Sequence, residues 1–221
     1  MRRTIFIFAW VLSAAIAVRA VAAPQAPPQG RVVDRIVARI EDDIILQSQM
    51  RELGAFQELV DGHRESDNKL LSELVEQWMV QTESSTVHFP APAKSEVDRE
   101  LARLKGQFAS PQAYSAKLRE LGLSADEVRQ LLARQIYIER YIDYKFRPSV
   151  QIESADIQAY YQKVLLPELA KNKQPVPRLA DVQEKIRELL TQRKISDLTA
   201  KWLDDTKSRL KIEVALPAAR P

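Results

Sequence analysis

The chain has 221 residues, of which 33 are Lys or Arg, 30 are Asp or Glu and none is Cys. The length allows one or two domains with a sizeable core, and 45% hydrophobic with 29% charged residues is typical of a globular protein. The lack of Cys excludes disulfides, Cys-based zinc sites, a thiol nucleophile and a lipid anchor on Cys.

The first 23 residues have the pattern of a secretory signal peptide. Residues 1–3 (Met-Arg-Arg) are basic, residues 5–18 are almost wholly apolar, and residues 20–22 (Ala-Val-Ala) offer a small-residue cleavage site. The apolar run is shorter than the roughly 20 residues of a membrane-spanning helix, so a retained anchor is the weaker alternative. We therefore expect export, cleavage near residues 22–23, and no stable membrane insertion afterwards.

Removal of this segment changes the charge balance. It takes away Arg2, Arg3 and Arg19 and no acidic residue, so the formal charge falls from +3 to zero. A neutral mature chain gives no reason to expect nucleic-acid binding. Residues 24–31 then form a Pro-rich leader that we expect to be flexible.

The folded part is predicted to begin with a β-hairpin. Apolar and polar residues alternate over 32–40, and residues 44–46 (Ile-Ile-Leu) form a second β-rich run. Residues 41–43 (Glu-Asp-Asp) lie between them; their spacing does not match an EF-hand, so we favour a solvated turn over a cation site. Because an isolated hairpin is only marginally stable, it must pack on something else.

Helices are predicted for most of the remaining chain. Apolar residues recur at helical spacing, and cap residues, Gly and Pro mark the ends. The last predicted helix changes the phase of its apolar pattern near residues 191–194. The predicted helices cover residues 48–60, 67–84, 94–107, 110–121, 124–146, 153–164 and 179–210.

The chain ends in a predicted short strand, residues 211–214, and a tail, residues 215–221, that we expect to be disordered. A lone four-residue strand needs a partner, and the hairpin is the available one. We therefore predict a single mainly α-helical domain over residues 32–214, with a small β-sheet in which the C-terminal strand joins the N-terminal hairpin.

No motif in the sequence indicates catalysis. His63 and His88 are the only histidines; each has Ser nearby, but a Gly-x-Ser-x-Gly elbow and a phosphate-binding Gly loop are both absent. We predict that the protein is not an enzyme and has no metal and no cofactor.

The order of several motifs resembles the SurA-type periplasmic chaperones. Residues 33–38 (Val-Asp-Arg-Ile-Val-Ala) and 44–48 (Ile-Ile-Leu-Gln-Ser) are similar to the hairpin and capped helix with which that family begins. The resemblance continues through residues 118–132, 150–161 and 182–214. It implies a periplasmic, ATP-independent holdase whose clients are unfolded outer-membrane and other envelope-protein precursors.

The sequence departs from that family in one respect. Many members insert parvulin-type prolyl isomerase domains before the C-terminal helix, whereas here only residues 162–181 occupy that position, and no Gly follows Gly122. The resemblance therefore implies the chaperone core without prolyl isomerase activity.

Six side chains are candidates for client binding. Tyr presents a large surface at low entropy cost and Met adapts to varied shapes, so both suit promiscuous binding. The same residues can equally be core residues, and we interpret Trp78 and Trp202 as core anchors. The candidates are Met50, Phe56, Met79, Tyr137, Tyr141 and Tyr144.

Two alternatives remain open at this point. The protein could be an envelope assembly or adaptor protein that binds one specific folded partner through its amphipathic helices. It could also form a homodimer by swapping the C-terminal helix, if residues 171–177 act as a hinge.

Overall fold

The structure is a computed structural model that describes residues 34–215, which belong to one compact unit. The predicted signal peptide (1–23) and leader (24–31) lie outside the described residues, as do residues 216–221 of the predicted tail.

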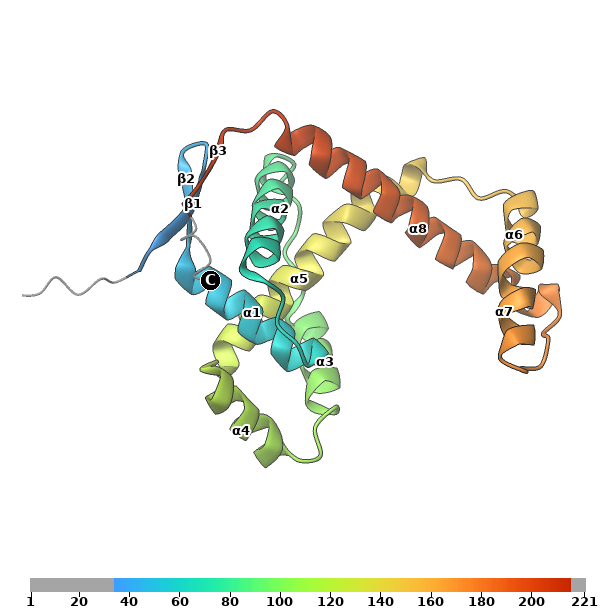
Figure 1. The fold of residues 1–221 in the computed structure, drawn as a ribbon, viewed down its shortest axis with the longest axis horizontal. Helices are drawn as coiled ribbons and strands as arrows, with labels where there is room; N and C mark the ends of the chain where they lie inside the picture. The colour runs from blue at the N-terminus through green and yellow to red at the C-terminus, as the bar shows by residue number, and fades with distance from the viewer. Residues whose placement is uncertain (1–33, 216–221) are drawn as a thin grey trace, which may run out of the picture. The chain divides into compact units, whose positions relative to one another are not determined.

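Strands and helices follow the predicted order along the chain (Figure 1). One predicted helix, that beginning at residue 153 or 154, continues beyond Val164 as α6, the π-helical turn η2 and α7. The elements are β1 (Ile36–Ile40), β2 (Asp43–Leu46), α1 (Gln47–Asp61), α2 (Asp67–Thr86), α3 (Lys94–Lys105), α4 (Pro111–Leu121), α5 (Ala125–Phe146), the 3-10 turn η1 (Arg147–Ser149), α6 (Ser154–Tyr160), η2 (Tyr161–Leu165), α7 (Leu166–Lys171), α8 (Leu179–Lys207) and β3 (Ile212–Val214).

The three strands form one antiparallel sheet in the order β2-β1-β3. This confirms the predicted mainly helical fold, in which the C-terminal strand joins the N-terminal hairpin. Glu41 in the hairpin turn reinforces the junction, because its N–H donates to the Lys211 carbonyl (3.0 Å) and its carboxylate accepts from the Lys211 N–H (2.7 Å). Asp43 accepts a hydrogen bond from the Trp78 indole (2.8 Å). The residues of the predicted solvated turn therefore form hydrogen bonds both to Lys211, just before β3, and to Trp78 on α2.

An irregularity in β1 lets the strand bury more side chains than simple alternation allows. The register with β2 shifts between Ile36 and Ala38, and the consecutive residues Val37 and Ala38 are both buried. A bulge turns adjacent residues toward the same side of a sheet. The central strand therefore contributes Val37, Ala38 and Ile40 to one core.

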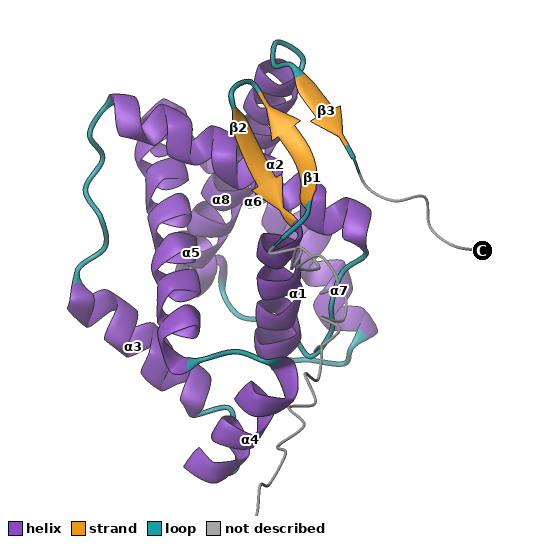
Figure 2. Ribbon diagram, turned by 90° about the vertical axis from the view of Figure 1, so that its left-hand side faces the viewer, coloured by secondary structure: helices purple, strands orange, loops and turns teal. Residues whose placement is uncertain are grey.

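Helix α1 connects two hydrophobic cores. Its first turns place Met50 and Leu53 in a core shared with the sheet and α2 (Figure 2), whereas Phe56 and Leu59 belong to a second core with α3, α4 and α5. Residues three apart lie on nearby faces of a helix, so the apolar side chains of α1 form one stripe along its length. The first half of the stripe packs in one core and the second half in the other.

Caps fix the ends of the helices around the second core. Ser124 Oγ accepts from the Glu127 N–H (3.1 Å) and the Glu127 carboxylate accepts from the Ser124 N–H (2.6 Å), which is the predicted capping box at the start of α5. Gly122 ends α4 in the left-handed conformation at φ 69°, as a C-terminal Gly is expected to do.

Helix α8 packs against different elements along its length, as Figure 1 shows. Arg187 near its start donates to the Ile152 carbonyl before α6, its middle packs on α5, and Leu203 reaches the first core. The shift of apolar phase near residues 191–194 does not break the helix. It accompanies the change of partner from α6 to α5.

The π-helical turn between α6 and α7 has a local cause. Pro167 has no N–H and its ring would clash with the carbonyl four residues earlier, so regular α-helix cannot continue through it. The Leu166 N–H instead donates to the Tyr161 carbonyl, five residues back. The widened turn carries the chain past Pro167 without ending the helix.

Truncation of Ile40 is expected to destabilise the protein far more than truncation of Ile44. Ile40 has an exposed fraction of 0%, whereas Ile44 on the neighbouring strand is 44% exposed. Ile40→Ala should lower the free energy of unfolding by about 2–4 kcal/mol and Ile44→Ala by less than about 1 kcal/mol. Urea unfolding followed by circular dichroism measures both, and equal losses would contradict the assignment of the core face.

Tyr114 offers a second test of the core, because its buried hydroxyl has no hydrogen-bond partner within the described residues. Tyr114→Phe should leave the free energy of unfolding unchanged or raise it by about 1 kcal/mol, since no hydrogen bond is lost. Tyr137→Phe is the matched control: the Tyr137 hydroxyl donates to Ser84 Oγ (2.8 Å), so its removal should cost about 1 kcal/mol. A clear loss in Tyr114→Phe would show that its hydroxyl is hydrogen-bonded.

Candidate binding groove

Three adjoining cavities line up along α5, and together we name them the α5 groove. The α3 hollow has a volume of about 320 Å³, the α2 hollow about 500 Å³ and the α8 hollow about 890 Å³. Val60, Gln135 and Glu139 line both the α3 and α2 hollows, and Ile142 and Leu203 are among those lining both the α2 and α8 hollows. The shared lining residues show that the hollows adjoin one another along α5.

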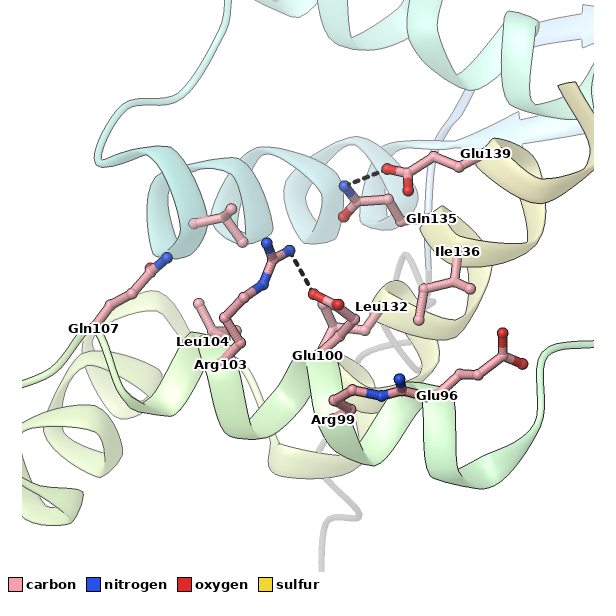
Figure 3. A pocket seen from close by; sticks show the side chains of 11 residues that line it. Glu96, Arg99, Glu100, Arg103, Leu104, Gln107, Leu132, Gln135, Ile136 and Glu139 are labelled. Atoms are coloured by element: carbon pink, nitrogen blue, oxygen red, sulfur yellow. Dashed lines mark hydrogen bonds and ion pairs between the residues drawn. The ribbon is translucent and has the colours of Figure 1, made fainter. Parts of the chain in front are cut away.

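The α3 hollow lies between α3, α5 and the end of α1 (Figure 3). Leu104, Leu132 and Ile136 provide its apolar lining. Both charges are present on its rim, and Arg103 pairs with Glu100 along α3. The hollow therefore combines an apolar lining with a balanced rim.

The α2 hollow is the next along α5 and has a more apolar lining. Helices α1, α2, α5 and α8 all contribute to it. Its polar residues include Gln57 and Gln77, whose side-chain amides both donate to the Glu73 carboxylate (2.7 and 3.2 Å). Its apolar residues are Leu53, Phe56, Val60, Val80, Leu131, Ile138, Ile142 and Leu203.

The α8 hollow lies between α5, α8 and the connector that joins α2 to α3. Phe89 from the connector and Tyr144 from α5 line one part of it, and Ile195 and Ala200 from α8 line another. Tyr144 is 61% exposed, the most exposed large hydrophobic side chain in this part of the groove. An aromatic ring is thus available to a partner at this end of the groove.

An ion-pair bridge holds α5 and α8 together beside the α8 hollow. The Arg147 guanidinium contacts Asp143 on α5 (2.7 Å) and pairs through two nitrogens with Glu188 on α8 (2.8 and 3.0 Å). The hydrogen bonds from Arg147, with one from Gln192, hold the pKa of Glu188 at about 2. The bridge fixes the point at which α8 passes α5.

The structure separates the six predicted client-binding residues into two groups. Met50 and Met79 lie in the first core, with exposed fractions of 3% and 2%, and Phe56 is buried in the second core at the lining of the α2 hollow. Met50 and Met79 are therefore core residues, which is one of the two roles that the sequence left open for them.

The three predicted tyrosines gather around Phe89, which lies in the Pro-containing connector between α2 and α3. Tyr137 and Tyr141 meet its ring edge-on at centroid distances of 5.6 and 5.3 Å, and Tyr144 lies tilted at 5.3 Å. These tyrosines, spaced i, i+4 and i+7 along α5, are therefore packed on by the protein's own connector: Tyr141 is buried, Tyr137 is partly buried and Tyr144 is exposed.

Burial changes the acidity of the central tyrosine. Tyr141 is buried beneath Phe89, and desolvation, with the nearby Glu83 carboxylate, raises its pKa to about 12. Lys145 forms an ion pair with the same Glu83. The hydroxyl of Tyr141 therefore keeps its proton to higher pH than that of an ordinary Tyr.

The tryptophans predicted to be core anchors are partly buried. Trp78 packs against the first core, while the Trp202 ring lies tilted against Phe146 (centroids 6.0 Å apart) with the Lys145 ammonium over it (5.1 Å). They hold α2 to the sheet and α8 to the end of α5.

Sequence reasoning missed the aliphatic residues of α5 that line the groove. Ile136, Ile138 and Ile142 belong to the predicted helix over residues 124–146 but were not among the candidates, and all three remain partly exposed in the hollows. The available signal was the width of the apolar surface on α5, which is larger than one packing face requires.

Membrane-spanning helices and metal-binding clusters are both absent from the described residues. None of the helices within residues 34–215 has the length and apolar character needed to span a membrane. In the same range, no group of three or more His, Asp or Glu side chains is placed to hold a metal ion.

Comparison with known proteins does not place the chain in a family. No protein-family model matches it, and no curated protein matches its sequence.

Tyrosine ionisation tests the aromatic cluster. A titration followed by absorbance at 295 nm should contain one tyrosine with a pKa of about 12, and Tyr141→Phe should remove that late step. Because the native state keeps the proton that the unfolded state loses near pH 10, this group should make stability fall between about pH 10 and 12. Tyr144→Phe is the control and should leave the late step in place; its disappearance in that variant would contradict the assignment.

Proposed function

We propose that the protein is an exported, ATP-independent chaperone of the periplasm that holds unfolded envelope proteins, outer-membrane precursors above all, without prolyl isomerase activity. The observation that carries this proposal is the α5 groove, a row of adjoining hollows in which apolar side chains lie among charged and polar ones. The signal-peptide pattern and the resemblance to SurA-type chaperones support the same function.

The shape of the groove suits a polypeptide better than a small molecule. A small-molecule site is usually one enclosed, largely pre-formed pocket, whereas here three hollows follow one another along a helix. Apolar side chains spaced along an unfolded segment could enter successive hollows while the backbone keeps its contact with water. We infer that the groove binds segments of chain rather than compact ligands.

Holding without ATP needs only a binding equilibrium. A protein that binds the unfolded chain lowers its free concentration and so slows aggregation. A disordered client loses entropy when it binds, so weak to moderate affinity is expected for each segment. Several neighbouring hollows compensate by offering many alternative ways to bind one client.

The test uses the mature chain, residues 24–221, and a dye-labelled, urea-unfolded outer-membrane barrel. Dilution of the barrel into increasing protein should give saturable anisotropy and reduced light scattering, and the same barrel already folded should give neither. Ile138→Ser with Tyr144→Ser should weaken binding several-fold, because each change removes apolar surface from the groove.

Ile44→Ser is the control, since Ile44 is an exposed apolar residue that lies on the sheet, outside the groove. It should bind the unfolded barrel as the parent does. Equal weakening by the control would remove the groove from the proposal. Absence of binding with unchanged scattering would overturn the chaperone function and favour an adaptor with one folded partner.

A further inference from the structure

The α2 hollow differs from its neighbours in the charge of its rim. Arg134 is the single basic side chain that lines it, whereas four acidic side chains do so: Asp61, Glu73, Glu76 and Glu139. In the α3 hollow, by contrast, Arg99 and Arg103 lie among the acidic residues.

Ion pairs do not neutralise these four carboxylates in the part of the chain that the structure describes. Within residues 34–215, none of them forms an ion pair with a Lys, Arg or His side chain. Acidic residues elsewhere along the groove are paired: Glu96 with Arg140 and Asp143 with Arg147. The α2 hollow therefore concentrates negative charge that other parts of the groove balance.

Glu73 shows the electrostatic consequence. It is partly buried at the edge of the apolar lining, and burial, with the charges of Glu76 and Asp61, raises its pKa above the usual value for Glu. Amide donors from Gln57 and Gln77 only partly offset this. A cation brought into the hollow would relieve the repulsion between these carboxylates.

The spacing of the four carboxylates indicates which kind of cation the α2 hollow can accept. The carboxylates are not clustered closely enough to hold a metal ion, since no such group occurs in the described part of the chain. They are spread around a lining that includes Phe56, Leu131, Ile138 and Ile142. An apolar floor with a negative rim complements a Lys or Arg side chain, whose methylene stem packs on apolar surface while its charged end reaches outward.

We propose that the α2 hollow selects client segments in which a Lys or Arg side chain stands among apolar residues. This inference rests on the proposed function and names the class of segment that one part of the groove prefers. The neighbouring hollows, with mixed rims, accept apolar side chains without that preference. The groove would then bind unfolded chains broadly but fix their register at basic residues.

The experiment uses three fluorescein-labelled peptides of equal length, with Leu and Val at alternate positions and Lys, Gln or Glu at two of the intervening positions. Fluorescence anisotropy with the mature chain measures the affinity of each. The Lys peptide should bind about fivefold more tightly than the Gln peptide and the Glu peptide most weakly, a size typical of partly exposed charge pairs. The preference for Lys should decline as salt is raised.

Two variants test the assignment to this hollow. Glu73→Gln with Glu76→Gln should abolish the preference for Lys over Gln. Gln77→Lys adds a positive charge of the protein's own to the rim of the hollow and should also abolish the preference for Lys over Gln. Glu168→Gln with Asp205→Asn, at exposed positions outside the groove, is the control and should preserve the preference.

The outcomes separate this inference from the proposed function. If the unfolded barrel is held but the Lys and Gln peptides bind equally, the chaperone function stands and the basic-residue preference is overturned. If the preference survives both Glu73→Gln/Glu76→Gln and Gln77→Lys in folded protein, verified by circular dichroism, the site lies elsewhere and the inference fails. If neither the barrel nor any peptide binds, the proposed function itself fails.

Discussion

The pairing of β3 with β1 is the interaction on which the rest of the structure depends. It joins the two ends of the described chain, and the two hydrogen bonds between Glu41 and Lys211 reinforce it at the hairpin turn. Because β3 follows α8 directly, the pairing holds the C-terminal end of that long helix beside the first core. The Arg147–Glu188 bridge holds α8 further back along its length. With both points fixed, α8 forms one wall of the groove.

The groove exists because the elements that pack on α5 do not cover all of its apolar surface. Its apolar surface is partly used by the second core and partly by α8, and the remaining residues, among them Ile138 and Ile142, line hollows. Burial of all this surface would stabilise the fold, since apolar area removed from water is the main favourable contribution to folding. Surface left open in this way is available instead for association with unfolded chains.

The three tyrosines of α5 show what the spacing of residues predicts and what it does not. Tyr137, Tyr141 and Tyr144 share one side of α5, as their spacing predicts, but Phe89 packs on all three. No local pattern indicates that contact, because Phe89 lies 48 to 55 positions earlier in a connector whose path depends on α2 and α3. Spacing therefore predicts which side of α5 the tyrosines share, whereas the choice between core and groove, which the sequence left open, is decided for Tyr141 by its burial.

The sequence by itself determined the helices, their caps, the hairpin and the closing strand, because helical spacing, capping residues such as Ser124 and the need of a short strand for a partner act locally or leave one solution. Tertiary structure alone decided which apolar side chains are core and which line the groove. Met79 and Ile138 look alike as helical apolar residues, yet one is enclosed by the sheet and the other borders a hollow. That difference depends on how distant elements pack, as does the gathering of Asp61, Glu73, Glu76 and Glu139 around one cavity.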